Sequence, residues 1–165
     1  MLIVNTVLGN IYKDDQLAKK IEDSKEQGKF RRLLLSRIEM EKSRLRKKTD
    51  DGFDIGFILE PGTKLQHGDV ISESDETILI EQLPEKILTV KFKQNDKNLF
   101  LLVGHIIGNR HRPISIRNET ISFPINDNSE MELFERLFHE VIHEIDLSID
   151  EQRFIPHTSM DVHEH

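Results

Sequence analysis

Hydrophobic and polar residues alternate over much of the first half of the chain, which is the pattern of β-strands with one face in water. The alternation is clearest over residues 30–49, and a further apolar strand is predicted over residues 53–59. The sequence Asp50-Asp51-Gly52 between them is a turn signal that joins strands into a hairpin. Residues 15–27 predict a polar connection or a weak helix that ends at the following glycine. Short strands and frequent turns predict a small all-β module over residues 1–81.

The second half of the chain has longer apolar segments with both the strand period and the helix period. In order, they predict a strand, a helix, two strands, a helix and a last strand, over residues 86–92, 96–108, 114–116, 121–123, 129–145 and 153–155. This βαββαβ order is that of ferredoxin-like folds. The chain is therefore predicted to be an α+β protein, with a ferredoxin-like domain over residues 86–155 and a flexible His-containing tail over residues 156–165.

The composition narrows the possible functions. A length of 165 residues fits one domain or two small ones. The net charge of −7, from 23 Lys and Arg against 30 Asp and Glu, argues against a protein that mainly coats nucleic acid or anionic membranes. The sequence shows no apolar run of about 18 residues and no signal-peptide pattern, so we expect a cytoplasmic protein without a membrane partner. With no Cys and eight His, a bound metal would have imidazole and carboxylate ligands.

Residues 98–113 are the most informative part of the sequence. Their apolar positions predict a helix, with Gly108 at its left-handed end and Pro113 preventing its continuation. His111 is therefore expected just beyond the helix C-terminus, where the last carbonyl groups favour a nearby cation by about 0.3–1 kcal/mol. A metal ion is one such cation. On spacing alone, however, a polar connection that binds nothing is the preferred interpretation.

Three segments, taken together, resemble the UreE family of urease accessory proteins. Gly108-Asn109-Arg110-His111, with a proline close behind, is similar to the GNRH segment of that family. Residues 50–70 resemble the turns and strand of the family's first domain, and Arg153-Phe154-Ile155-Pro156 resembles the element before its His-bearing terminus. The resemblance covers most of residues 40–165 and changes the interpretation of His111 to that of a metal ligand.

The resemblance implies a nickel-binding metallochaperone that delivers Ni²⁺ for assembly of the urease active site, and not an enzyme. In this family the histidine of the GNRH segment lies at the two-fold axis of a homodimer, where both copies hold one ion, and His111 occupies that place. Tail histidines of the family supply further ligands, which implies this role for His157, His163 and His165. The implied partners are the urease apoprotein and urease maturation proteins including the GTPase UreG, and residues 1–81 are interpreted as a peptide- or partner-binding domain.

The chain departs from some relatives in its histidines. His105 is one residue out of register with a second histidine that precedes their GNRH segment, and the tail carries three histidines instead of a long run. Imidazole binds Ni²⁺ readily, but Cu²⁺ binds the same ligands more tightly and Zn²⁺ competes, so either can occupy the same site. Because a histidine ligand must be neutral, loading is predicted to fall as the pH drops through about 6.5.

A second motif points to a different class of protein. His139-Glu140-Val141-Ile142-His143 matches HExxH, in which two histidines one helical turn apart hold zinc and the glutamate activates water. A catalytic zinc needs a third protein ligand, and no continuation of the motif supplies one. A small zinc hydrolase using His139, Glu140 and His143 is the enzymatic alternative, and a weak secondary metal site on these residues or on His105 is an intermediate one.

The stretch of residues 31–48 contains eight Lys or Arg against two Glu, which gives a third alternative, a nucleic-acid-binding module. Modules that read RNA on strands stack bases on exposed aromatic side chains, and none is interleaved here. We therefore prefer a solvated, charged face that protects the edge of a sheet, with a docking surface for an acidic partner as the next interpretation.

Overall fold

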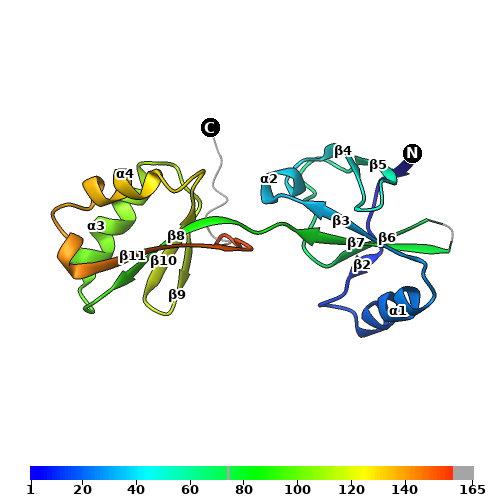
Figure 1. Cartoon of the computed structure of the whole chain (residues 1–165), viewed down its shortest axis with the longest axis horizontal. Coiled ribbons are helices and arrows are strands. Elements are labelled where there is room, and N and C mark those ends of the chain that lie inside the picture. The colour runs from blue at the N-terminus through cyan, green and yellow to red at the C-terminus, as the bar shows by residue number, and fades with distance from the viewer. Residues whose placement is uncertain (74, 158–165) are drawn as a thin grey trace. The chain divides into compact units, whose positions relative to one another are not determined.

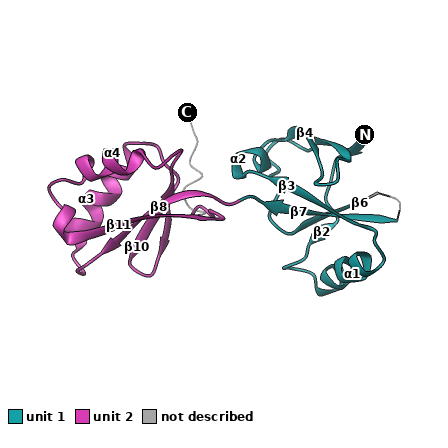
Figure 2. Ribbon diagram, viewed as in Figure 1, with its two compact units in different colours: residues 1–83 teal, residues 84–165 magenta. Residues whose placement is uncertain are grey.

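The computed structural model describes residues 1–73 and 75–157. The chain forms two compact units, residues 1–83 and residues 84–165, which Figure 2 shows in different colours. Both units combine strands with helices, so the α+β class that the sequence predicts is confirmed (Figure 1). In the described part of the chain, no helix is both long and apolar enough to cross a membrane.

The first unit contains two sheets. The three-stranded sheet has the order β1-β5-β4, formed by Leu2–Val4, Asp54–Ile58 and Arg44–Lys48. The four-stranded sheet has the order β2-β6-β7-β3, formed by Gly9–Asn10, Asp69–Glu73, Glu76–Gln82 and Phe30–Leu35. The predicted turn at Asp50-Asp51-Gly52 joins β4 to β5, and Gly52 has a φ of 89° that glycine adopts without strain.

The main core of the first unit lies between its two sheets. Val4, Ile55 and Phe57 come from the three-stranded sheet and form one cluster with residues of the other sheet. That second contribution consists of Leu33, Leu35, Ile71, Ile78 and Ile80. The alternation that predicts strands with one wet face therefore marks the inner faces of a two-sheet sandwich.

The first unit is not all-β, because residues that the sequence assigns to a connection or weak helix form α1 (Asp15–Glu26). The carboxylate of Asp14 caps its N-terminus by accepting hydrogen bonds from two backbone N–H groups. Leu17 and Ile21, one turn apart, pack against β6 and β7 in a separate small cluster. The apolar stripe of α1 is narrow, and the helix is stabilised mainly by docking on the sheet. This explains why the sequence indicates the helix only weakly.

A second, short helix interrupts the predicted strands of residues 30–49. It is α2 (Arg37–Met40), and it begins with a capping box in which Ser36 and Glu39 each accept a hydrogen bond from the backbone of the other. Met40 anchors it in the main core at 4% exposure. The S-x-x-E pattern of the capping box was therefore a helix signal inside an otherwise strand-like stretch.

The second unit contains one four-stranded sheet and two longer helices. Along the chain its elements are β8 (Glu85–Phe92), α3 (Lys97–Gly108), β9 (Ser115–Arg117), β10 (Thr120–Pro124), α4 (Glu130–Leu137), a 3₁₀ turn (Ile142–Glu144) and β11 (Ile145–Gln152). The strand order is β11-β8-β10-β9, and every neighbouring pair is antiparallel. The βαββαβ sequence of elements that we predict for this half is thus present in the structure.

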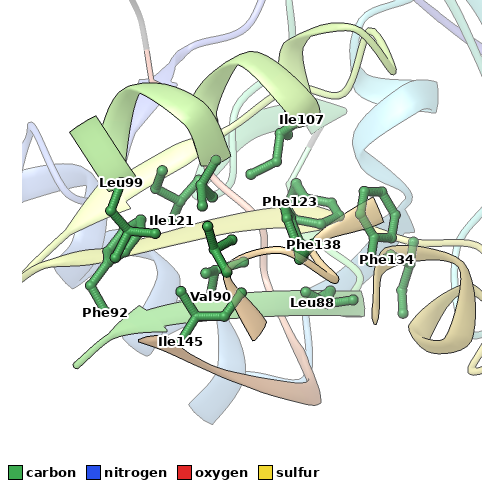
Figure 3. Packing of buried hydrophobic residues seen from close by; sticks show 13 residues of the cluster. Leu88, Val90, Phe92, Leu99, Ile107, Ile121, Phe123, Phe134, Phe138 and Ile145 are labelled. Carbon is green, nitrogen blue, oxygen red and sulfur yellow. The ribbon is translucent and has the colours of Figure 1, made fainter. Parts of the chain in front are cut away.

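The core of the second unit lies between the helices and one face of its sheet. Figure 3 shows Leu99 and Ile107 of α3 pointing toward the strands, above Phe123 and Val90. Three phenylalanines form a connected aromatic group, since the ring centroids of Phe123 and Phe134 lie 4.6 Å apart and those of Phe134 and Phe138 5.9 Å apart. Helix α3 is therefore held along one side by the core, and its opposite side remains available.

The predicted helix over residues 129–145 is wrong in its second half. Helix α4 ends at Leu137, and the chain passes through turns into β11 (Ile145–Gln152), which pairs with β8 along its whole length. The predicted last strand over residues 153–155 is also wrong, because the strand has already ended. Pairing with β8 requires an extended chain from Ile145 onward, so the tertiary contact overrides the local helix period.

Candidate metal site at the end of helix α3

His111 lies three residues beyond the last residue of α3 and is exposed. Its φ is 52°, which places its backbone in the left-handed region. Its N–H donates a hydrogen bond to the carbonyl oxygen of Gly108 at 2.9 Å, so the helical path continues in tighter turns before it reverses at His111. The prediction that Gly108 is the left-handed residue is wrong, since Gly108 is still helical.

The left-handed backbone of His111 is informative about function. A residue with a β-carbon pays about 1–2 kcal/mol for this conformation, and glycine adopts it freely. Folding alone therefore favours glycine at this position, and the imidazole needs another reason to be there. Residues in sparsely populated backbone regions cluster at binding and catalytic sites, which makes His111 a candidate on structural grounds as well.

Arg112 fixes the loop that carries His111. Its guanidinium donates one hydrogen bond to the carbonyl oxygen of Pro124 at 3.0 Å and another to the carboxylate of Glu130 at 2.6 Å. The other carboxylate oxygen of Glu130 accepts the backbone N–H of Asn126 at 2.9 Å. The side chain of Glu130 is 12% exposed, so the pair is shielded from water. The loop after α3 is thereby tied to the end of β10 and the start of α4.

His105 lies on the exposed side of α3, one turn before the site. The side-chain amide of Asn109 lies 3.0 Å from His105 Nε2, in position to donate a hydrogen bond to it. His105 and Asn109 are four residues apart on the helix surface, which explains the contact. Asn109 thus has a partner within the helix, and His105 remains a neighbour of the site with no ligand role assigned.

His157 is the tail histidine that the structure brings near the same loop. Its backbone N–H donates a hydrogen bond to the carbonyl oxygen of Ile114 at 2.8 Å, three residues after His111. The imidazole of His157 belongs to an exposed residue. The predicted ligands His163 and His165 lie outside the described residues. Within residues 1–73 and 75–157, no group of three or more His, Cys, Asp or Glu is arranged to hold a metal ion in one chain.

The HExxH motif does not lie on a helix. His139 follows the C-cap of α4, and His143 lies in the 3₁₀ turn, so the two histidines do not have the spacing of one α-helical turn. His139 Nδ1 lies 3.0 Å from the carbonyl oxygen of Arg136, to which an Nδ1–H donates. Both side chains of the His139–Glu140 pair are more than 70% exposed. The geometry that the zinc hydrolase alternative needs is therefore missing.

The basic stretch of residues 31–48 is largely neutralised within the first unit. Arg31 donates hydrogen bonds to both Asp51 and Glu76 at 2.6 Å, and its guanidinium stacks on the ring of Phe53. Further ion pairs in the stretch are Arg32–Glu81, Arg37–Glu41, Arg46–Asp54 and Lys47–Glu39. Five of the eight basic residues thus have acidic partners, which favours the solvated, charged face over a nucleic-acid surface.

These contacts change the acid–base behaviour of the first unit. The hydrogen bond from Arg31 lowers the pKa of Glu76, and hydrogen bonds from Thr49 and Arg31 lower that of Asp51. The guanidinium of Arg46 lowers the pKa of Asp54 in the same way. The carboxylates of this unit are therefore stabilised in their ionised form by neighbours that the fold supplies.

The sequence did not reveal Arg112 and Glu130 as residues of the site. They are 18 positions apart, and no local pattern links them. The available signal was the position of Glu130 in the first turn of a predicted helix, where a carboxylate is favoured and can reach a neighbouring loop. The contact itself follows only from the packing of α4 beside the end of β10.

Comparisons with known proteins agree with the resemblance noted in the sequence. Residues 4–81 match the family model described as the N-terminal domain of the UreE urease accessory protein. The urease accessory protein UreE of Streptococcus vestibularis is 28% identical over 153 residues, covering 93% of this chain and 97% of the relative. The urease accessory protein UreE 1 of Pseudomonas syringae pv. tomato is 28% identical over 137 residues, covering 83% and 92%. The chain is therefore similar to UreE urease accessory proteins over most of its length, and its residues 4–81 match the N-terminal domain of that family.

Proposed function

We propose that this protein carries Ni²⁺ for urease maturation, as a homodimer in which His111 of each copy holds the same ion. The observation that carries the proposal is the exposed imidazole of His111, held on a left-handed backbone at the end of α3. The nickel ion is cargo in this scheme, and the protein needs no catalytic group. The names of the relatives describe accessory proteins of urease, which agrees with a non-enzymatic role.

The outer side of α3 supports a dimer. Leu101 is 72% exposed and Leu102 38%, and no charged side chain occurs between Asn98 and Gly108. Gly104 and Gly108 present open backbone, since a β-carbon at either position would meet no atom within 4 Å. An apolar helix face of this kind suits contact with another protein surface. A two-fold axis beside the end of this helix would bring the two His111 residues together, because a two-fold contact repeats each residue.

The ligand chemistry fits an ion that is bound and later released. Two imidazoles across a two-fold axis leave coordination positions on Ni²⁺ for His157 and, in our proposal, for His163 and His165. A site completed by residues near the chain terminus exchanges ligands more readily than a closed cage. Cu²⁺ and Zn²⁺ suit the same ligands, so selection for nickel depends on geometry and on metal availability.

The partners that we propose follow from the similarity to UreE proteins. The urease apoprotein is the destination of the nickel, and the GTPase UreG is the protein through which it passes in the family. We infer that residues 1–81 form the partner-binding domain and residues 86–155 a ferredoxin-like metal-binding domain. The antiparallel strand order β11-β8-β10-β9 and the βαββαβ element order support that fold for the second domain.

The main test compares the wild type with His111→Gly. Glycine suits the left-handed backbone, so the variant is expected to fold at least as stably as the wild type. Its Ni²⁺ affinity by calorimetry should fall at least about 100-fold, the upper effect known for residues that only support a ligand. His143→Ala, which removes another exposed histidine, is the matched control and should bind normally. Unchanged affinity in His111→Gly would overturn the proposal.

The dimer is tested by charging the outer face of α3. In Leu101→Glu, the solution mass should fall from dimer to monomer and the Ni²⁺ affinity should fall with it. Leu8→Glu changes another exposed leucine, 58% exposed and in the first unit, and should remain dimeric. A wild type that is monomeric with bound Ni²⁺, or equal Ni²⁺ affinity at pH 7.5 and about 5.5, contradicts a site built from paired imidazoles.

A further inference from the structure

The five residues after β11 span the sheet of the second unit from one edge to the other. These residues, 153–157, are called the strap below. β11 is one edge of the sheet, and the opposite edge is β9. The strap leaves the end of β11 at Gln152, and the N–H of His157 donates to the carbonyl oxygen of Ile114, directly before β9, at 2.8 Å. Its two ends are thus fixed on opposite sides of the sheet.

The strap is close to its maximal length. Three inter-strand spacings of about 4.8 Å separate β11 from β9, which makes about 14 Å. Five residues reach at most about 17 Å when fully extended. With about 3 Å of slack, the middle of the strap can rise at most about 5 Å from the sheet before it pulls His157 from Ile114.

Phe154 is the residue that anchors the middle of the strap. It is 2% exposed, whereas its neighbour Ile155 is 52% exposed. Phe154 lines a groove of ≈310 Å³ together with Ile87 of β8. Ile87 alternates with Leu88, which belongs to the core beneath the helices, so Ile87 lies on the opposite face of the sheet, and yet it is 1% exposed. The ring of Phe154 therefore lies on the face that the helices leave open.

The rest of that open face is polar. Four hydroxyl side chains stand opposite one another across the four strands, and this hydroxyl row consists of Ser148, Thr89, Ser122 and Ser115. The hydroxyls of Thr89 and Ser122 are 2.9 Å apart and hydrogen-bonded. All four residues line the same groove as Phe154. The apolar contact that holds the strap on the sheet is therefore concentrated in the ring of Phe154, and the surface around it is polar.

The strap connects this ring to the candidate metal site. Ile114, which holds the end of the strap, follows His111 by three residues, so the two lie at most about 10 Å apart along the chain. We propose that Phe154 is a positioning residue that keeps the strap on the sheet and thereby places His157 beside His111 as a ligand for Ni²⁺. The inference rests on the proposed function, and it adds a mechanism for release, since withdrawal of the ring frees His157.

The first test is a double-mutant cycle of Ni²⁺ affinity in the full chain. Phe154→Ala and His157→Ala should each weaken binding about 10-fold, because Phe154 acts only through His157 and the paired His111 ligands remain in both variants. If Phe154 acts through His157, the double variant should also be about 10-fold weaker and not about 100-fold. Ile155→Ala changes the exposed neighbour and should bind like the wild type, and Phe154→Leu should restore most of the affinity. A double variant that binds Ni²⁺ about 100-fold more weakly than the wild type would mean that Phe154 and His157 act independently, and it would overturn the inference.

The second test needs no metal. Amide exchange of His157 in the metal-free protein should be at least about 10-fold faster in Phe154→Ala than in the wild type, with Val90 of β8 unchanged. Phe154→Val, a smaller reduction of the same contact, gives this comparison if the alanine variant unfolds, and Phe154→Leu should exchange at His157 nearly as slowly as the wild type. Unchanged exchange at His157 overturns the strap mechanism even if nickel binds as proposed. Fast exchange in the variant, combined with normal Ni²⁺ binding by His111→Gly, refutes the proposed function and leaves the strap intact.

Discussion

The two units differ in the kind of surface that they present to solvent. In the first unit, at least five of the eight basic residues of the stretch 31–48 bind carboxylates of the same unit, with Arg31 joined to both Asp51 and Glu76. In the second unit, α3 exposes Leu101 to solvent and ends in an exposed imidazole on a left-handed backbone. Composition alone directs attention to the first unit, because it holds the concentrated charge.

Under the proposed function, this difference means that charge density alone would point to the wrong unit for the metal site. Charged side chains that pair within their own unit are part of its folding, and exposed ion pairs of this kind contribute little each. Apolar surface and backbone strain that the fold does not require are better guides, since a function must explain them. The predictions below test whether the two units are as different in stability and acid response as in surface.

The largest effect is expected from the cores. Phe134 is fully buried between Phe123 and Phe138, and Phe134→Ala should destabilise the second unit by about 3–5 kcal/mol. The counterpart Ile78→Ala, in the core of the first unit, should cost that unit about 2–5 kcal/mol. Hydrogen exchange followed by mass spectrometry reports on each unit separately. Equal loss of protection in both units after either change would show that they unfold together, against the comparison drawn here.

The next effect concerns the loop of the candidate metal site. Arg112→Ala leaves the shielded carboxylate of Glu130 without its charged partner, so the second unit should lose about 1–3 kcal/mol in urea denaturation. Arg110→Ala removes an exposed arginine two residues away and should change stability by less than about 0.5 kcal/mol. Equal effects of the two substitutions would mean that Arg112 does not fix the loop.

Acid should act mainly on the first unit. Its carboxylates Asp51, Asp54 and Glu76 have lowered pKa values, so their folded forms hold protons less readily than the unfolded chain. The stabilisation is complete above the ordinary carboxyl pKa and is lost progressively as the pH falls from about 5 through the lowered values. The urea midpoint of the first unit should fall more steeply over this range than that of the second. Arg31→Met should flatten the dependence, and a steeper fall in the second unit would contradict the prediction.

The smallest effect is a gain in stability. Asn118 and Glu119 form the two-residue turn between β9 and β10 with φ values of 44° and 62°, the pattern of a type I′ turn. Glu119→Gly should stabilise the second unit by up to about 1 kcal/mol, because glycine adopts a positive φ without strain. Thermal unfolding measures the gain, and Asn118→Ala should act in the opposite direction. A lower melting temperature for Glu119→Gly would show that the glutamate makes a contact worth more than the strain.

Local signals explain which elements the sequence could predict. The two short strands that became β9 and β10 and the apolar helix ending near Gly108 were predicted because short patterns determine them. The end of α4 was not, because residues 138–145 keep the apolar spacing of a helix although the chain must straighten to pair with β8. The alternation of Ile145, Leu147 and Ile149 with polar residues was a strand signal that the helix period concealed.

Only part of the candidate site could likewise be predicted from the sequence. His111 could be singled out from the resemblance, together with its place after a helix. Its left-handed backbone could not, because glycine three residues earlier was the better local candidate for that conformation. The tie between Arg112 and Glu130 and the bond from His157 to Ile114 join residues 18 and 43 positions apart, which no local pattern reveals.

The hydroxyl row limits the apolar surface that the second unit would expose if the strap lifted, as the proposed release of His157 requires. The side chains uncovered would be mainly hydroxyls that water hydrates well, with the ring of Phe154 and Ile87 as the apolar exceptions. A small apolar area offers other molecules little surface to bind. An open copy of the protein is therefore expected to resist aggregation until the strap returns to the sheet.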